Sequence, residues 1–255
     1  MKYTILYEDT DLIICVKPVG IASQDEKGLQ PALTDLLKQH LSKQTTQKGI
    51  PYLGIIHRLD KPVGGVMVYA KTKTAAAALS RQITFNQIKK HYYAVLSGTP
   101  FQSSATLINY LIQDKKNNKS IICESSNPEA KKAELSYQII DQISLNLENQ
   151  EASYTLTLAD ILLKTGRHHQ IRVQFSHIGC PLYGDCKYNP TCKPIPTLTQ
   201  RKNPAIALYS YGLEFFHPKT GKIMQFSHTP TDEIWRLFPI LSNNKKLPLE
   251  NRKVE

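Results

Sequence analysis

A basic and an acidic side chain interrupt an apolar stretch of the chain. The sequence from Gly54 to Thr74 is GIIHRLDKPVGGVMVYAKTKT, in which strand-forming residues flank Arg58 and Asp60. A carboxylate or a guanidinium is costly to bury unless it is paired or in use. One interpretation is a strand that ends in a surface turn with a local ion pair. The other is a reactive carboxylate held at a cleft by a strand on each side.

Histidine and cysteine gather further along the chain and raise the question of a metal site. Residues of these types within one 25-residue stretch are His168, His169, His177, Cys180, Cys186 and Cys192. Five residues separate neighbouring cysteines of this group. Structural zinc sites use cysteine pairs with about two to four residues between them. The spacing therefore predicts no metal.

The tetrapeptide His-Arg-Leu-Asp, residues 57–60, also occurs in the catalytic loop of protein kinases. A kinase further requires a glycine-rich loop upstream and an Asp-Phe-Gly motif downstream. Neither is present in this sequence, so a kinase is excluded.

The charge of the chain points to a polyanionic partner. Its 255 residues include 32 Lys and Arg against 21 Asp and Glu, for a formal net charge of +11. Such an excess favours nucleic acid or an acidic membrane surface as the partner. The length suffices for a large core, in one extended domain or two small ones.

Several classes of protein are not favoured by the sequence. No apolar run is long enough for a membrane span, and the first residues lack the apolar stretch of a signal peptide. The five cysteines show no disulfide framework. We therefore expect a cytoplasmic protein with reduced thiols and no membrane association.

Strands outnumber helices in the pattern of apolar residues. Helical spacing is predicted for residues 31–44, 72–85, 167–178 and 231–241. Strands are predicted on both sides of a turn at 8–11, on both sides of residues 57–60, at 89–98, 104–112, 119–123, 133–140 and 153–163, and in a hairpin over 205–230. The pattern predicts an α+β fold with a mixed, mostly antiparallel sheet and flanking helices.

Three separated motifs resemble the RluA-type RNA pseudouridine synthases. HRLDKPVGGVMVYAK, residues 57–71, is similar to the family signature of His-Arg-Leu-Asp, a turn and an apolar strand. KHYYAVLSG, residues 90–98, resembles the Lys-x-Tyr-x-Ala strand of that family. TGRHHQIRVQFSHIGCPLYGD, residues 165–185, resembles its Gly-Arg-x-His-Gln-Ile-Arg block. With weaker similarities at the start and at ALYSYGLEFFHP, residues 207–218, the motifs follow the family order over residues 3–230.

This resemblance implies a fold, an activity and a substrate. It implies the pseudouridine synthase catalytic fold over residues 1–240. An S4-type RNA-binding domain often precedes this fold in the family, but we expect none here, and we expect a frayed tail at 241–255. The implied activity is the isomerisation of uridines in structured RNA, either ribosomal or transfer RNA, without a cofactor. We expect a monomer with no obligate protein partner.

The resemblance also assigns roles to particular residues. Asp60 matches the catalytic aspartate of the family and would act as a nucleophile on the sugar or as a base on a sugar proton. Arg167 would pair with that aspartate and hold it in its charged form. Tyr92 would pack against the target uracil, and Leu208 would line the pocket for this base.

Basic side chains near these motifs are candidates for contacts to RNA. Arg58 resembles the family arginine at the space that a flipped nucleotide leaves, and flipping costs a few kcal/mol. Further candidates for phosphate contacts are Lys61, Lys71, Lys73, Arg81 and Arg172. The alternative function is a basic RNA-binding protein or RNA-folding factor without essential catalysis, for which Asp60 would not be needed.

Overall fold

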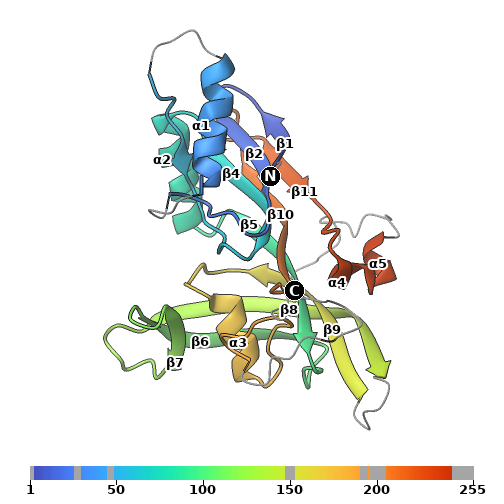
Figure 1. Ribbon diagram of the computed structural model, residues 1–255. Coiled ribbons are helices and arrows are strands. Elements are labelled where there is room, and N and C mark those ends of the chain that lie inside the picture. The colour runs from blue at the N-terminus through green and yellow to red at the C-terminus, as the bar shows by residue number, and fades with distance from the viewer. Residues whose placement is uncertain are drawn as a thin grey trace.

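In the computed structural model, the eleven strands of the described residues form a single sheet (Figure 1). The helices of the same residues pack against the faces of this sheet. The structure describes residues 3–25, 30–44, 49–146, 153–189, 195 and 205–242. The strands are β1 (Thr4–Glu8), β2 (Leu12–Lys17), β3 (Gly54–Ile55), β4 (Gly64–Ala70), β5 (Lys89–Ser97), β6 (Ser104–Asp114), β7 (Lys119–Cys123), β8 (Lys131–Asn146), β9 (Ser153–Leu163), β10 (Leu208–Phe216) and β11 (Ile223–Ser227). The helices are α1 (Leu33–Gln44), α2 (Lys73–Thr84), α3 (Gln170–His177), α4 (Glu233–Arg236) and α5 (Pro239–Ser242).

The sheet is mixed but mostly antiparallel, as the sequence predicts. Its strands follow the order β1-β2-β4-β10-β5-β9-β8-β6-β7, with β3 beside β4 and β11 beside β10. Within the described residues β10 and β4 pair in parallel, whereas the other strand pairs are antiparallel. The α+β class is therefore confirmed.

Side chains alternate between the two faces of the sheet and divide the core into layers. On β5, Tyr92 and Ala94 belong to one apolar cluster, whereas Tyr93 and Val95 belong to another, as the two-residue period of a strand requires. Helix α1 and, through Ile171 and Phe175, helix α3 bury apolar residues in the cluster that contains Tyr92. Helices α2, α4 and α5 contribute to the clusters of the opposite face. We call the face with Tyr92, α1 and α3 the front face.

Two predicted helices differ in the structure from the sequence prediction. The helix expected over 167–178 begins only at Gln170, because His169 adopts a left-handed conformation with φ 51°. The helix expected over 231–241 is divided into α4 and α5 by Pro239, which has no N–H group to donate. Of the predicted tail, 241–255, all but residues 241 and 242 lie outside the described residues.

A glycine pair lets β4 run unusually close to β10. Gly64 and Gly65 are buried, and Gly65 has φ +129°. A Cβ atom on Gly65 would lie 2.1 Å from the carbonyl oxygen of Ser210, its partner in the parallel pairing of the two strands. The glycines therefore serve the packing of β4 against β10 rather than a turn.

Among the described residues, no helix is long and apolar enough to cross a membrane.

Candidate active site

Asp60 lies in the connection between β3 and β4, as the motif predicts. The two strands pair with each other, so residues 56–63 form a loop that leaves the sheet and returns to it. The Ser23 hydroxyl donates to the Leu59 carbonyl oxygen (2.7 Å) and accepts from the Leu59 N–H (3.0 Å). The Asp60 carbonyl oxygen accepts from the Val63 N–H (2.9 Å). The backbone at Asp60 is therefore fixed before any substrate arrives.

A buried lysine holds the other side of the same loop. The Lys17 ammonium donates to the carbonyl oxygens of Ile21 (2.6 Å), Pro18 (3.1 Å) and Lys61 (3.2 Å). The N–H of Gly20 donates to the same Lys61 oxygen (2.9 Å). The chain that follows β2 thus binds the residue directly after Asp60.

Arg172 is the arginine that faces Asp60. Its Nη1 lies 3.5 Å from Asp60 Oδ2. Its Nε and Nη2 donate to Asp185 at 2.7 and 2.8 Å, which is the fork geometry of a guanidinium on a carboxylate. Burial alone would lower the pKa of Arg172, but the bonds and charge of Asp185, together with the charge of Asp60, raise it. Arg172 therefore stays charged and presents its free nitrogen to Asp60.

The predicted pair of Arg167 and Asp60 is not formed. Arg167 is exposed and donates from Nε to the carbonyl oxygen of Lys132 (2.9 Å). Within the described residues Asp60 forms an ion pair with Arg172 and lies 3.5 Å from the imidazole of His169. Helix α3 begins after His169. Arg167 therefore lies in the exposed turn before the helix, whereas Arg172 lies within the helix and is buried.

His169 is the second partner of Asp60, and its hydrogen bonds indicate which nitrogen carries the proton. Its Nε2 lies 3.5 Å from Asp60 Oδ2, and its Nδ1 lies 2.9 Å from the Tyr188 hydroxyl. The Tyr188 oxygen already accepts from the Ser120 N–H (2.6 Å), so its own proton is available to His169 Nδ1. The neutral ring then carries its proton on Nε2, towards the carboxylate.

The surroundings of His169 keep its imidazole neutral. Burial, followed by the charge of Arg172, lowers the pKa of His169 to about 3. The ring of Tyr188 stands perpendicular to that of His169, and the guanidinium of Arg172 lies 5.1 Å from the Tyr188 ring centroid. Tyr188 thus contacts both residues that face Asp60.

Tyr92 and Leu208 lie on neighbouring strands of the front face. Leu208 pairs with Ala94, and Ser210 pairs with Tyr92, in the register of β10 and β5. Both predicted residues are buried in the cluster that also contains Leu59 from the loop of Asp60. Burial raises the pKa of Tyr92, and the charge of Asp60 adds to the rise, so the phenol remains protonated. The structure thus brings Tyr92 and Asp60 to one face.

The predicted RNA contacts divide into four groups. Arg58 and Lys61 are exposed on either side of Asp60 and remain candidates. Lys71 is engaged within the protein, because its ammonium donates to Glu8 (2.8 Å) and to the Asp9 carbonyl oxygen. Lys73 and Arg81 lie on α2, which packs on the face opposite Tyr92. The partners of the buried Arg172 are carboxylates, so it is no phosphate contact.

Three residues of the site were not predicted to lie at Asp60. His169, Asp185 and Tyr188 fall in or just after the third motif, but no role was assigned to them. A signal was present, because Arg172 stands in the apolar run of Ile171 and Val173, and a buried arginine requires an acidic partner.

Because His57 and His169 are neutral in the folded protein, we expect its stability to fall below neutral pH. Burial, followed by the charge of Lys90, lowers the pKa of His57 to about 3, and His169 is lowered to the same value from 6.5. Between about pH 6.5 and pH 5, the unfolded chain binds protons at these positions and the native protein does not. The free energy of unfolding in urea should therefore decrease over this interval. His169→Gln should flatten the decrease, and an unchanged slope would contradict the prediction.

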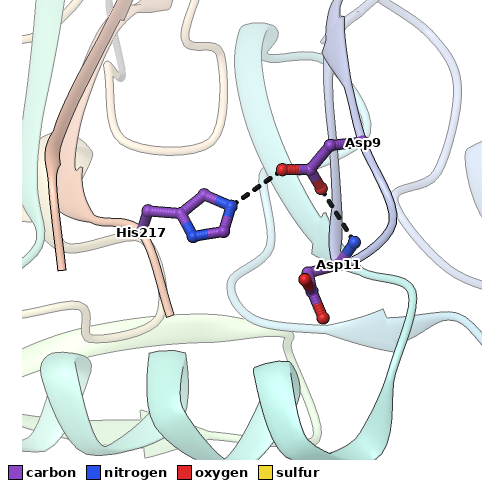
Figure 2. Close-up of side chains that lie close together, drawn as sticks. All are labelled: Asp9, Asp11 and His217. Carbon is purple, nitrogen blue, oxygen red and sulfur yellow. Dashed lines mark hydrogen bonds and ion pairs between the residues drawn. The ribbon is translucent and has the colours of Figure 1, made fainter. Parts of the chain in front are cut away.

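A group of possible metal ligands lies away from Asp60. Asp9, Asp11 and His217 come close together between the β1–β2 turn and the end of β10 (Figure 2). The Asp9 carboxylate accepts from His217 Nε2 (2.8 Å), from the Tyr7 hydroxyl (2.9 Å) and from the N–H groups of Asp11 and Leu12. The Nδ1 of His217 accepts from two backbone N–H groups. These hydrogen bonds join the β1–β2 turn to the turn after β10. They account for the cluster without a metal.

Comparison with known proteins gives one family. The family model for RNA pseudouridylate synthase matches residues 11–177. The chain is 30% identical over 245 residues to the uncharacterized RNA pseudouridine synthase YlyB of Bacillus subtilis, covering 96% of this chain and 74% of that protein. It is 31% identical over 242 residues to the ribosomal large subunit pseudouridine synthase D of Nitrosomonas europaea, covering 94% and 65%. Among solved structures, the human RNA pseudouridylate synthase domain containing 4 has a similar fold, with a TM-score of 0.71 at 23% identity over 93% of this chain and 92% of that one.

Proposed function

Because this chain belongs to the RNA pseudouridine synthase family, we propose that it isomerises uridines of large-subunit ribosomal RNA with Asp60 as the catalytic carboxylate. The observation that carries the role of Asp60 is its position between Arg172 and His169, on the face that also bears Tyr92. The names of relatives such as the ribosomal large subunit pseudouridine synthase D of Nitrosomonas europaea support ribosomal RNA as the substrate.

The chemistry of the isomerisation matches these side chains. The reaction breaks the bond between C1′ and N1 of uridine, turns the uracil, and joins C1′ to C5. Atoms and electrons balance within the nucleotide, so the net reaction requires no oxidant, reductant or water. Two routes are open to Asp60, attack on C1′ or removal of a sugar proton. On either route the enzyme must hold the freed base and exclude water.

The partners of Asp60 prepare its carboxylate for this step. Arg172 and the Nε2–H of His169 both approach Oδ2, which leaves Oδ1 for the sugar. Tyr92 offers a ring on which the detached uracil can pack, and its hydroxyl would assist removal of the C5 proton. Leu208 would line the pocket for the base. Arg58 and Lys61, exposed beside Asp60, would meet RNA phosphates and offset the cost of flipping the nucleotide.

Further properties follow from this function. We propose that the protein works in the cytoplasm as a monomer, without a cofactor or an obligate protein partner. The net charge of +11 favours association with a polyanion, and the RNA substrate is a polyanion.

The decisive experiment is pseudouridine mapping of ribosomal and transfer RNA from cells that lack the protein. We expect one or more positions of large-subunit ribosomal RNA to lose pseudouridine, to regain it with the wild type, and to remain unmodified with Asp60→Asn. Loss confined to transfer RNA would overturn the substrate. Restoration by the variant would overturn the role of Asp60, and no change in any RNA would favour an RNA-binding or RNA-folding protein.

A further inference from the structure

Lys90 is a buried lysine without a partner among the described residues. It lies on β5 with an exposed fraction of 9%, and its ammonium forms no hydrogen bond or ion pair with any of the described residues. Lys17, which is also buried, donates to three carbonyl oxygens and shows how such a charge is normally accommodated. Burial, followed by the charge of Arg167, lowers the pKa of Lys90. A buried ammonium without a partner destabilises the folded protein, so its presence suggests a functional role for Lys90.

The strand places Lys90 on the same face as the proposed active site. Lys90 and Tyr92 are two residues apart on β5, so their side chains leave the same face about 7 Å apart. Lys90 pairs with Leu163 at the end of β9, directly before the turn that leads to Arg167 and α3. The ammonium therefore lies between the strand of Tyr92 and the turn that carries Arg167.

A glycine opens this position to the outside. Gly166 is exposed, and its φ is not in the left-handed region, so the backbone does not require a glycine here. A Cβ atom at Gly166 would have one described heavy atom within 4 Å, which is Lys90 Nζ at 3.3 Å. The missing side chain thus leaves the ammonium uncovered. Arg167, the next residue, is exposed and donates a hydrogen bond from Nε to the carbonyl oxygen of Lys132.

We propose that Lys90 and Arg167 bind a phosphate of the RNA next to the target uridine, through the opening at Gly166. Lys90 and Arg167 repel each other, and no carboxylate of the described part of the chain pairs with Lys90; an anion between the two cations would offset the repulsion. A phosphodiester supplies this charge together with oxygen acceptors for the lysine. Because Lys90 leaves β5 on the same face as Tyr92, the phosphate would belong to a nucleotide near the one whose uracil packs on that ring. This site rests on the proposed function, because RNA supplies the phosphate.

The test combines RNA affinity, its salt dependence and protein stability. The probe is a ribosomal RNA hairpin with the uridine found by mapping, or oligouridine if mapping finds none. For Lys90→Met we expect about tenfold weaker binding near 0.15 M salt and a salt slope smaller by about 0.7–0.9, the value for one phosphate contact. The urea midpoint should stay the same or rise, because an unpaired buried charge is removed.

Two matched variants separate a local contact from a general effect of charge. Lys219→Met removes an exposed lysine from the β10–β11 turn and should change the affinity less than twofold. Gly166→Val keeps every charge but covers Lys90 Nζ, so it should weaken RNA binding in the same way as Lys90→Met. An unchanged affinity and salt slope for Lys90→Met would overturn the site, and so would a lowered urea midpoint. Because these outcomes concern RNA affinity and not the formation of pseudouridine, they differ from a failure of the proposed isomerisation.

Discussion

Asp60→Asn is expected to lower the rate of pseudouridine formation by about 10³-fold or more, while RNA binding stays close to that of the wild type. Asparagine has nearly the shape of aspartate, so the loop between β3 and β4 should keep its conformation. The amide carries no negative charge with which to attack C1′ or take a proton. The contacts of Asp60 with Arg172 and His169 are long, at 3.5 Å, so weakening them should leave both partners in place.

The stability of Asp60→Asn should also be nearly unchanged. The Asp60 side chain is 34% exposed, and Arg172 keeps its two hydrogen bonds to Asp185 when the charge of Asp60 is lost. Partly exposed ion pairs contribute at most about 1 kcal/mol. A loss of activity in a stable, RNA-binding variant would therefore report on the chemistry and not on folding.

The measurement is a single-turnover assay with excess enzyme on the RNA that mapping identifies. The matched control is Asp232→Asn, an exposed aspartate at the start of α4, which packs on the face opposite Tyr92. We expect the control to react at the wild-type rate. If Asp60→Asn kept more than a tenth of the wild-type rate, Asp60 would not be the catalytic carboxylate.

The position of Asp60 could be predicted from sequence because the signal is local. Apolar residues before Ile56 and after Val63 predict strands, and the polar run between them predicts a loop at their junction. The structure confirms this arrangement, with β3 and β4 paired on either side. Tyr92 and Leu208 were placed on strands for the same reason, because strand patterns depend mainly on neighbouring residues.

The choice between Arg167 and Arg172 depended on a feature that the sequence conceals. A continuous helix from Arg167 was expected, but the left-handed conformation of His169 delays the helix to Gln170. This conformation is rare for residues other than glycine and is maintained by tertiary contacts, including the bond from Tyr188 to His169. The arginine at the carboxylate is thus determined by residues from elsewhere in the chain.

The ion pair of Lys71 and the role of Gly64 and Gly65 could not be predicted for a similar reason. Lysine near a nucleic-acid motif suggests a phosphate contact, yet Glu8, 63 residues earlier, binds the Lys71 ammonium. The small size of Gly64 and Gly65 allows β4 to approach Ser210, which is far away in sequence. Such long-range contacts leave no trace in the local pattern.

Asp185→Ala is expected to lower the free energy of unfolding by about 3–5 kcal/mol, the largest change in stability that the site predicts. Asp185 is fully buried and accepts both hydrogen bonds of the Arg172 fork, so its removal leaves a buried guanidinium without its main partner. Asp185 also accepts weaker bonds from the N–H groups of Lys187 and Tyr188. Urea denaturation at neutral pH measures the loss. A change below about 1 kcal/mol would show that Arg172 is not held by this pair.

The double variant Arg172→Met/Asp185→Leu separates the structural role of the pair from its chemical role. Replacing both charges with apolar groups removes the unpaired guanidinium, so part of the lost stability should return. The recovery should be incomplete, because the N–H groups of Lys187 and Tyr188 lose their acceptor. Activity should not return, because no guanidinium faces Asp60 and the carboxylate is neither oriented nor stabilised. A stable double variant that forms pseudouridine at the wild-type rate would show that Arg172 serves the fold alone.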